Sequence, residues 1–446
     1  MINDNYKIKW DKYFNAANSC QAVRLTGKIV KVAGIVAEAN GPGLSVGSLC
    51  VIKNSEGLNI QAEVVGFNEK SIIIMPFGEM RGIKPGSRVL ATDKRPGVQV
   101  GEAYLGRVVD GLGRPIDGKG IIRGEKEYPI YADVLNPLKR EIIHDVIDVG
   151  ICSINALLTI GKGQRIAIMS GSGVGKSVLI GMIARNTSAD VIVMALIGER
   201  GREVREFIEN TLGEKGLKKS VVVVATSDSP PLVRIRGAYV ATTLAEYFRD
   251  KGLDVILVMD SITRFAMSLR EVGLAAGEPP SAKGYTPSVF SEIPKLLERA
   301  GTVEKTGSIT GIYNVLVEGD DMNEPITDCV RSVADGHIVL TRSLSHKGHY
   351  PAVDVLASIS RVMKDIIDSE HYDNAKKLIE VLSTYRAAED LIRIGAYVDG
   401  SDPEIDVAKK IIKKINSFLR QDIYQKVSFH ESVDRLKDLF EDRIAQ

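Results

Sequence analysis

The sequence has little of what marks several classes of protein. It contains only four cysteines among 446 residues, a single tryptophan and a formal net charge of +1. The cysteines are scattered and form no C-x-x-C pair, which argues against a disulfide framework or a zinc site and predicts free thiols. They are Cys20, Cys50, Cys152 and Cys329. Because the balanced charge leaves no excess positive field, nucleic acid is not an expected partner.

Long apolar runs are also missing. The longest have the length of a strand, far below the roughly 20 residues of a membrane-spanning helix. The opening stretch MINDNYKIKWDKYF carries charges throughout and lacks the apolar core of a signal peptide. The sequence therefore predicts a cytoplasmic protein. Its 44% of hydrophobic and 26% of charged residues are typical of a soluble chain, and its length favours two or three domains.

Four segments follow one another along the chain. Residues 1–22 form an N-terminal segment outside any domain, and residues 23–95 alternate short β-branched runs with turn residues, which predicts a small β-barrel or sandwich. Residues 96–361 open with a hinge-like, glycine-rich passage, residues 101–120, and then alternate strands with helical periodicity. Residues 362–446 place apolar residues three and four apart, which predicts a helical domain.

Four continuous apolar runs in the third segment predict strands buried on both faces of a parallel sheet. They are RIAIMS, DVIVMALIG, SVVVVATS and DVILVMDS, which begin at residues 165, 190, 220 and 254. Because helical patterns separate the runs, the predicted fold class is α/β with a doubly wound sheet. Sheets of this kind bind ligands beyond the carboxyl ends of their strands.

The loop after the first of these strands carries a phosphate-binding pattern. SGSGVGKS, residues 170–177, matches G-x-x-x-x-G-K-[ST] except at Ser170, where a small residue fits if its φ stays negative. The backbone N–H groups of such a loop cradle phosphates, its lysine reaches the β- and γ-phosphates, and its last hydroxyl binds Mg²⁺. The expected nucleotide-binding residues are Gly171, Ser172, Gly173, Val174, Gly175, Lys176, Ser177 and Val178. The alternative is a glycine-rich turn without a ligand, which is common between strands and helices.

Two carboxylates follow neighbouring apolar runs. Asp260 ends DVILVMD, and together with Lys176 and Ser177 it predicts a Mg²⁺ site, although an Asp there can instead cap the next helix. Glu199 follows VIVMALIG within GERGRE and is the candidate to orient or deprotonate the water that attacks ATP. From the residues alone, a surface cluster of salt bridges explains that charged stretch equally well.

Five long motifs, in their order and spacing, resemble the catalytic subunits of rotary-type ATPases. Within that group the chain is most similar to the flagellar and type III secretion export ATPases. The motifs are SGSGVGKS, LIGERGREVREF, VMDSITRFA, PPSAKGYTPSVFSEIPKLLERAG and HYPAVDVLASISRVM, and the resemblance runs from about residue 25 to about residue 421. It implies ATP hydrolysis with Mg²⁺ by a RecA-like P-loop core, with an N-terminal β-barrel and a C-terminal helical domain.

The resemblance gives roles to the residues that match its motifs. It puts Lys176 on the phosphates and Ser177 and Asp260 on the metal. It makes Glu199 the carboxylate that polarises the attacking water.

The same resemblance implies roles for four further side chains. Arg200 in the GER motif and Arg264 in SITRF fall at two arginines of the family's site. Tyr350 in HYPAVD matches the aromatic residue that stacks on adenine. Arg361 in SISR matches the arginine finger, which each subunit gives to its neighbour's site to stabilise charge on the transferred phosphoryl group.

An assembly is implied as well. The family forms a homo-hexamer with ATP at the subunit interfaces, working at the inner face of the membrane export apparatus with an export gate, chaperones and exported proteins. A dimeric regulator binds the N-terminal segment, and a central stalk-like protein enters the pore. By resemblance the acidic loop at residues 318–328 faces that pore. Its Asp320 and Asp321 could bind a metal, but local caps of the turn before Pro325 are favoured.

The N-terminal segment predicts a short amphipathic helix. NYKIKWDKYF places Tyr6, Trp10 and Tyr13 or Phe14 at helical spacing with lysines between them. Such an aromatic face is suited to a partner or to peripheral contact with a membrane surface. Packing against the protein's own barrel explains it equally well from sequence, and the resemblance favours a partner.

Several alternatives stay open. The phrases GSDPEID and INSFLRQ look more like the flagellar enzymes than like the injectisome enzymes, and the site chemistry is shared with F- and V-type ATP synthase catalytic subunits. A ring-shaped nucleic-acid motor would need stacking aromatics in its β-domain, where residues 23–94 hold only Phe67 and Phe77. A non-catalytic nucleotide-binding subunit would lack a carboxylate such as Glu199.

Overall fold

The computed structural model divides the chain into two compact units, Met1–Pro96 and Gly97–Gln446. The described residues are Trp10, Tyr13, Phe14, 25–54, 57–92, 95–133, 136–304, 306–317, 319 and 321–441. The segment predicted to bind a regulator, residues 1–22, therefore lies outside the described residues except for Trp10, Tyr13 and Phe14. Tyr6 and Cys20 of this segment are among the residues outside them. Each unit has a hydrophobic core of its own.

The first unit is a closed β-barrel. Its antiparallel strands follow the order β1-β2-β5-β4-β3-β6, and β6 pairs back onto β1. They are β1 (Thr26–Ala33), β2 (Val36–Asn40), β3 (Leu49–Lys53), β4 (Asn59–Asn68), β5 (Ser71–Pro76) and β6 (Arg88–Ala91). Alternate residues point inward, so that Ile29, Ala39, Ile52 and Ile74 fill the interior. Of the two β architectures expected for this region, the barrel is the one formed.

The second unit is built on a sheet of nine strands among the described residues. The order is β17-β16-β10-β15-β13-β11-β12-β8, with β14 paired to β15 off this path. The strands are β8 (Arg107–Asp110), β10 (Arg165–Ser170), β11 (Val191–Ile197), β12 (Ser220–Ala225), β13 (Asp254–Asp260), β14 (Gly301–Thr302), β15 (Ser308–Leu316), β16 (Gly336–Leu340) and β17 (Ile359–Ser360). From β16 to β8 all neighbours are parallel, and the four apolar runs are β10 to β13, which confirms that prediction. A separate antiparallel pair joins β7 (Gly97–Val100) to β9 (Lys126–Pro129).

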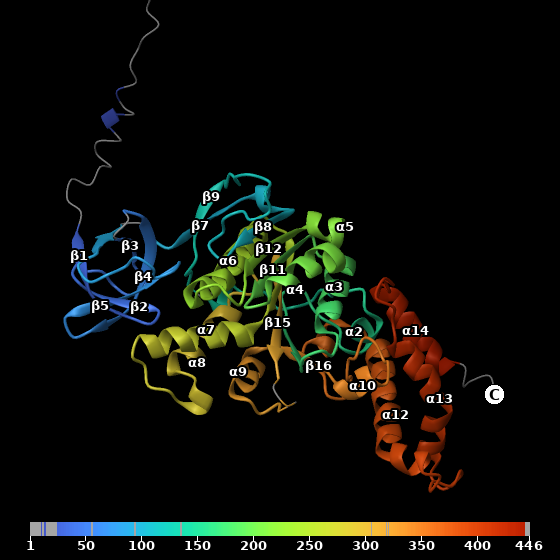
Figure 1. The fold of residues 1–446 in the computed structure, drawn as a ribbon. Helices are drawn as coiled ribbons and strands as arrows, with labels where there is room; N and C mark the ends of the chain where they lie inside the picture. Colours follow the sequence, from blue (N-terminus) through green and yellow to red (C-terminus); the bar gives the residue numbers. More distant parts are fainter. Residues whose placement is uncertain are drawn as a thin grey trace, which may run out of the picture. The chain divides into compact units, whose positions relative to one another are not determined.

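Helices cover both faces of this sheet, which confirms the doubly wound α/β class. Figure 1 shows α6 and α7 on one side of the strands and α2, α3 and α5 on the other. The helices are α2 (Cys152–Leu157), α3 (Lys176–Asn186), α4 (Gly201–Glu206), α5 (Gly213–Lys218), α6 (Pro231–Asp250), α7 (Ile262–Ala275), α8 (Pro287–Leu297), α9 (Pro325–Val333), α10 (Arg342–His346), α11 (Met363–Ile366), α12 (Ser369–Arg393), α13 (Pro403–Leu419) and α14 (Phe429–Glu441). A π-helical turn, η3 (Phe207–Leu212), joins α4 to α5. Short 3-10 turns are η1 (Glu102–Tyr104), η2 (Pro137–Lys139) and η4 (Ala282–Gly284).

The glycine-rich passage at residues 101–120 is not a hinge, contrary to the sequence prediction. Strand β8 lies within it and pairs in parallel with β12, so the passage forms the edge of the sheet. Arg107 of β8 donates two hydrogen bonds to the Asp117 carboxylate, at 2.7 and 2.9 Å, which tie down the turn that follows the strand. The four-residue strand RVVD is too short to be recognised as an apolar run.

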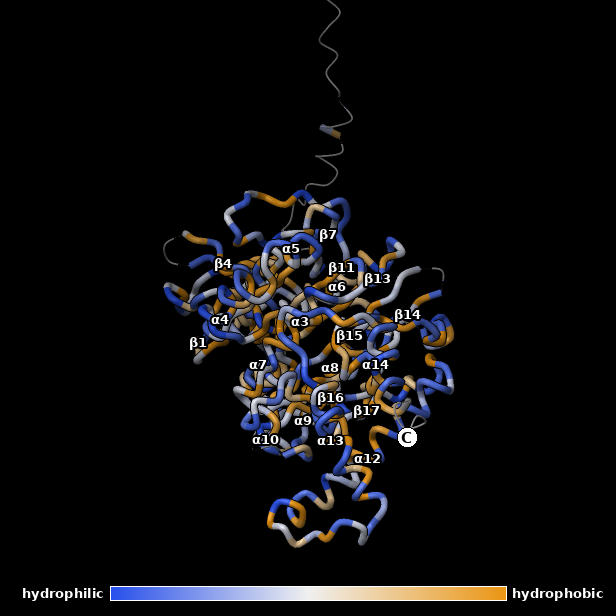
Figure 2. Tube along the Cα trace, turned by 90° about the vertical axis from the view of Figure 1, so that its right-hand side faces the viewer, coloured by the Kyte–Doolittle hydropathy of each residue, from blue (hydrophilic) through white to orange (hydrophobic). Residues whose placement is uncertain are grey.

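The C-terminal helices share the core of the nucleotide-binding fold. Leu378, Leu382, Ile415 and Leu436 from these helices belong to one hydrophobic cluster with Ile154 of α2. Figure 2 shows hydrophobic residues gathered along the central strands β11 and β13 of the same unit. The helical segment is thus stabilised by burial against α2 as well as by packing among its own helices.

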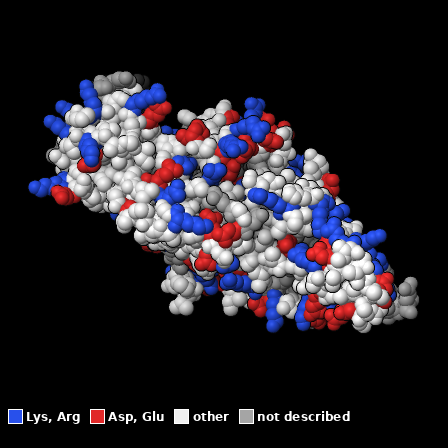
Figure 3. All heavy atoms as spheres, turned by 60° about the horizontal axis from the view of Figure 1, so that its bottom comes forward, with Lys and Arg blue, Asp and Glu red and all other residues white. Residues whose placement is uncertain are grey.

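The surface is mixed in charge. Figure 3 shows acidic and basic side chains interspersed over the face that it presents, in keeping with the net charge of +1. None of the helices among the described residues combines the length and the apolar character that crossing a membrane requires. The three described cysteines, Cys50, Cys152 and Cys329, are free thiols as expected.

Candidate nucleotide-binding site

The carboxyl ends of β10, β11 and β13 bring the predicted site residues to one edge of the sheet. Ser170 at the end of β10 pairs with Leu316 of β15, and Asp260 at the end of β13 pairs with Leu196 of β11. Because parallel strands end at a common edge, the segments that follow them converge there. They surround a cavity of about 650 Å³. Its lining includes Gly171, Ser172, Gly173, Gly175, Lys176, Ser177, Val178, Glu199, Arg200 and Arg264.

The loop between β10 and α3 has the backbone of a phosphate cradle. Gly173 and Gly175 have φ values of 80° and 95°, in the left-handed region that favours glycine. Helix α3 begins at Lys176, and no described side chain caps its first N–H groups, which leaves them available to an anion. Ser170 ends β10 without a positive φ, so a serine is accommodated there as expected. Val174, the remaining predicted residue of the loop, is buried beneath it.

Lys176 and two carboxylates form the centre of the site. Lys176 Nζ lies 2.7 Å from Asp260 Oδ1 and 3.8 Å from Glu199 Oε1. The buried Asn314 of β15 donates its amide to the same Asp260 oxygen at 2.6 Å and so fixes that carboxylate. Ser261, not Asp260, is the N-cap of α7, and the alternative role of Asp260 as a helix cap is therefore wrong.

Glu199 and Arg200 point to different surroundings although they are adjacent in sequence. The Glu199 side chain is only 17% exposed and faces Lys176, whereas Arg200 is 76% exposed and pairs with Glu203 at 3.2 Å. Burial raises the pKa of the Glu199 carboxyl to about 7, and the charge of Asp260 adds to the rise. The surface salt-bridge interpretation thus holds for Arg200 and fails for Glu199. Arg200 nevertheless lines the cavity.

Arg264 reaches the cavity from α7. Its Nε is buried and has no hydrogen-bond partner within the described part of the chain, so this donor is available to an anionic ligand. A Cβ on Gly198 would lie 2.8 Å from Arg264 Cβ, and Gly198 has a φ of 74°. Glycine at this position therefore allows α7 to approach β11 and turns the chain toward Glu199.

Tyr350 lies beside the phosphate loop. A Cβ on Gly175 would be 3.5 Å from Tyr350 Cε1, while the tyrosine itself is 45% exposed. Its hydroxyl is 2.9 Å from Ser345 Oγ, which holds the ring in place. An exposed aromatic face next to a phosphate cradle is suited to stacking on a nucleotide base.

Arg361 is the one predicted catalytic residue that the structure does not bring to this cavity. Its backbone N–H donates to Asp335 O at 2.9 Å, and the N–H of Asp335 donates to Arg165 O at 2.8 Å, which places Arg361 level with the first residue of β10. The phosphate loop follows the last residue, Ser170. At about 3.3 Å per residue, the strand between them spans roughly 16 Å. The exposed Arg361 guanidinium makes no hydrogen bond or ion pair with any residue that the structure describes.

The site fits a divalent cation held together with phosphate oxygens. The Glu199 and Asp260 carboxyls both face the single ammonium of Lys176. The Asp260 carboxylate and the Ser177 hydroxyl are oxygen ligands of the kind that Mg²⁺ prefers, and Mg²⁺ usually takes one or two side chains plus phosphates. Across the described ranges, no three His, Cys, Asp or Glu side chains converge to form an all-protein metal site.

Sequence reasoning missed three residues of this site. Asn314 escaped because SITGIYNVL, with its interspersed polar residues, was not recognised as a strand, although one amide in a buried run is itself a signal. Gly198 could have been found as the glycine between a buried strand and Glu199. Arg342, the first residue of α10, lines the cavity and carries no motif.

The chain matches three family models. Residues 150–360 match the ATP synthase alpha/beta family, nucleotide-binding domain, and residues 29–93 match the beta-barrel domain of the same family. Residues 367–438 match the T3SS EscN ATPase C-terminal domain.

Curated relatives and solved structures span almost the whole chain. It is 54% identical over 415 residues to the flagellum-specific ATP synthase of Bacillus subtilis, covering 93% of this chain and 94% of that one. It is 47% identical over 420 residues to the type 3 secretion system ATPase of Xanthomonas euvesicatoria, covering 94% and 95%. The assembled ATPase EscN of the enteropathogenic E. coli type III secretion system superposes with a TM-score of 0.87 at 45% identity, covering 93% of this chain and 99% of that chain. EscN in complex with its central stalk EscO gives 0.85 at 44% identity over the same shares.

Proposed function

This chain belongs to the ATP synthase alpha/beta family, in the group of flagellum-specific and type III secretion ATPases, and we propose that it works as a ring of six copies that drives export of flagellar proteins. It is an ATPase of the export group. The flagellar branch is supported by the 54% identity to the flagellum-specific relative of Bacillus subtilis, although the 47% identity to the secretion ATPase of Xanthomonas euvesicatoria equals that to the flagellum-specific relative of Salmonella typhimurium. The injectisome remains the alternative within the same chemistry.

The residues of the cavity divide the work of hydrolysis. The N–H groups of the loop and Lys176 bind the phosphates of ATP, and Arg264 adds a second cation. Ser177 and Asp260 would hold Mg²⁺, which would neutralise charge on the phosphate oxygens. Glu199, the buried carboxylate beside Lys176, orients the attacking water and accepts its proton.

One observation supports the proposed ring of six copies. Arg361 lies about a strand length from the phosphate loop of its own subunit, with an exposed side chain that no described residue holds. A site that needs a cation on the transferred phosphoryl group is then completed by the Arg361 of a neighbouring copy. Closed rings are the assemblies that repeat one such head-to-tail contact without leaving an open end. The assembled form of EscN supports this arrangement.

The dependence of the ATPase rate on protein concentration tests whether the protein works as a ring. The steady-state ATPase rate per subunit is expected to rise with protein concentration and then level off, because a lone subunit lacks the arginine of its neighbour. Native mass spectrometry on the same dilutions should show the six-copy species rising in step with the rate. A rate per subunit that stays constant down to concentrations at which only the single chain is detected would contradict the proposal.

We further propose that a central stalk enters the ring and that a dimeric regulator binds the N-terminal segment, at the inner face of the membrane export apparatus. The stalk is supported by the EscN complex with EscO. Asp321, in the loop expected to face the pore, accepts a hydrogen bond from the Asn323 N–H at 3.0 Å, so the local-cap interpretation is confirmed for this residue. Asp320 lies outside the described residues. Trp10, Tyr13 and Phe14 are all more than 60% exposed, as a partner-binding face requires.

Removal of residues 1–20 tests the N-terminal proposal. The shortened chain is expected to lose binding to the dimeric export regulator, measured by isothermal titration calorimetry, because aromatic side chains carry most of the energy of such contacts. A second variant, the full-length chain with Trp10→Ala and Phe14→Ala, should show the same loss of regulator binding. Unchanged regulator affinity in both proteins would rule out this segment as the binding site.

A further inference from the structure

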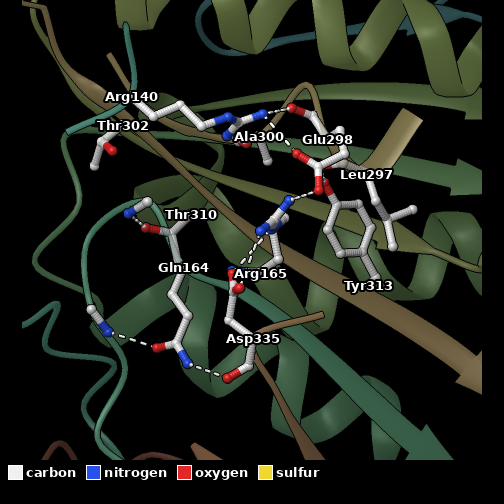
Figure 4. A network of polar contacts seen from close by, with 12 residues as sticks. Arg140, Gln164, Arg165, Leu297, Glu298, Ala300, Thr302, Thr310, Tyr313 and Asp335 are labelled. Atoms are coloured by element: carbon white, nitrogen blue, oxygen red, sulfur yellow. Dashed lines mark hydrogen bonds and ion pairs between the residues drawn. The ribbon is translucent and has the colours of Figure 1, made fainter. Parts of the chain in front are cut away.

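A fully buried glutamine precedes the strand that leads to the phosphate loop. Gln164 stands directly before β10, and its side chain uses both ends of its amide. Its Oε1 accepts the N–H of Gly161 at 2.9 Å, and its Nε2 donates to Asp335 O and to Ser360 Oγ, each at 3.1 Å. Figure 4 shows the Gln164 amide directed toward Asp335, whose carboxylate is held in turn by Arg165.

The two groups that Gln164 holds are the immediate supports of Arg361. Asp335 O, which accepts from Gln164, also accepts the backbone N–H of Arg361 at 2.9 Å. Ser360, the residue before Arg361, donates its hydroxyl to Thr159 O at 2.7 Å while accepting from Gln164. The Gln164 amide therefore contacts a support on each side of the Ser360–Arg361 peptide, the Ser360 hydroxyl and the Asp335 carbonyl.

Close packing at the same point leaves little freedom to this segment. Ser360 pairs with Gly336 where β17 meets the start of β16. A Cβ on Gly336 would lie 2.4 Å from Ile359 O and 3.1 Å from Ser360 Cα, so only glycine allows the two strands to approach this closely. The Asp335 carboxylate accepts hydrogen bonds from Arg165 Nε at 3.0 Å and from Arg165 Nη2 at 3.1 Å. Arg165 also pairs with Glu298 at the C-terminal end of α8, so Asp335 is linked through Arg165 to that helix (Figure 4).

We propose that Gln164 is a positioning residue for Arg361, and that it thereby acts on the ATP site of the neighbouring subunit rather than on its own. This inference rests on the proposed function, in which Arg361 works in trans. The backbone of Arg361 must be held still because its long side chain is otherwise unsupported, and an arginine finger misplaced by about 1 Å can lose most of its effect. The position of Gln164 at the start of β10 gives this role to the strand whose other end forms the subunit's own phosphate loop.

The test is the variant Gln164→Met, which keeps the length of the side chain and removes its hydrogen bonds. Steady-state kcat is expected to fall roughly tenfold to a hundredfold, with the affinity for a fluorescent ATP analogue and the assembly of the ring unchanged. Mixing Gln164→Met with a second inactive variant then shows whether its own ATP site or its Arg361 is impaired. An equimolar mixture with Glu199→Gln should regain activity, because the intact site of one variant receives the well-placed Arg361 of the other. A mixture with Arg361→Ala should regain none, because neither variant supplies a working arginine.

The opposite pattern would overturn the inference. If Gln164 supports its own phosphate loop instead, Gln164→Met will weaken nucleotide binding and will be rescued by Arg361→Ala but not by Glu199→Gln. The positioning role is also overturned if Gln164→Met turns over normally, or if its activity recovers in a mixture with neither Glu199→Gln nor Arg361→Ala. If the reference mixture of Arg361→Ala with Glu199→Gln itself fails to recover, the trans mechanism of the proposed function is what has failed.

Two further variants keep the test independent of folding. Ser360→Ala removes one hydrogen-bond partner of Gln164, directly before Arg361, and is expected to give the same mixing pattern with a smaller loss. Asn155→Leu is the matched control, because Asn155 is also a buried amide with three hydrogen bonds, to Val149 N, Asp148 Oδ1 and Val427 O. Its side chain makes no printed bond to Gln164, Asp335 or Ser360, so the variant should lower thermal stability without the mixing pattern.

Discussion

Arg361→Ala is expected to lower kcat for ATP hydrolysis by about 10³- to 10⁵-fold, the effect of removing an arginine finger. The cavity around Lys176 is lined by Arg200, Arg264 and Arg342. In the proposed ring, the Arg361 of a neighbouring copy adds the cation that meets the charge developing on the transferred phosphoryl group. Nucleotide affinity should change little, because Arg361 is remote from the cavity of its own subunit. Steady-state turnover and equilibrium binding of a fluorescent ATP analogue measure the two quantities separately.

Mixing two inactive variants distinguishes an Arg361 that acts on a neighbouring subunit from damage within one subunit. An equimolar mixture of Arg361→Ala with Glu199→Gln should recover part of the wild-type rate, since some interfaces join an intact Glu199 site to an intact Arg361. Arg205→Ala is a suitable control, because that arginine is 80% exposed and its ion-pair partner among the described residues is Glu209, four residues along the chain. Near-normal turnover of Arg361→Ala would make an interfacial mechanism untenable and leave a single-subunit NTPase.

Glu199→Gln is expected to lower kcat by roughly 10²- to 10⁴-fold, the usual contribution of a general base. The amide keeps the shape of the side chain but cannot accept the proton of the attacking water. ATP binding should persist, because the loop and Lys176 are untouched. Glu209→Gln, which alters a carboxylate on the exposed side of the same segment, should turn over normally.

The raised pKa of Glu199 adds a pH signature. Because burial holds this pKa at about 7, the carboxyl is increasingly protonated as the pH falls below 7, and only the ionised form can act as a base. For the wild type, kcat/KM is therefore expected to fall as the pH is lowered through this range. The residual rate of Glu199→Gln should lack that fall, while ionisation of ATP affects both proteins alike. A parallel pH dependence in the two proteins would show that the base is another group.

Some strands of the sheet could be predicted from the sequence pattern and others could not. Strands β10 to β13 were predictable because a central parallel strand is buried on both faces and so reads as an unbroken apolar run. β15 lies between β10 and β13 and was missed, because Thr310 and Asn314 interrupt its run. Each of these polar side chains has a hydrogen-bond partner far away in sequence, Gly163 N for Thr310 and Asp260 Oδ1 for Asn314, which no local window contains. The glycine-rich passage was misread for a related reason, since a strand of four residues is defined by its pairing with β12.

The sequence by itself determined the phosphate loop, the strand ends that carry Asp260 and Glu199, and the succession of barrel, α/β core and helices. These follow from local periodicity, from glycine at left-handed positions and from motif spacing, all of which are properties of short stretches of chain. Only the tertiary structure decided that Glu199 turns inward while Arg200 turns outward, and that Arg361 lies at the opposite end of β10 from the loop. The reason is physical: burial, pKa and reach depend on which segments the sheet places side by side, and strand order is set by packing between residues far apart in sequence.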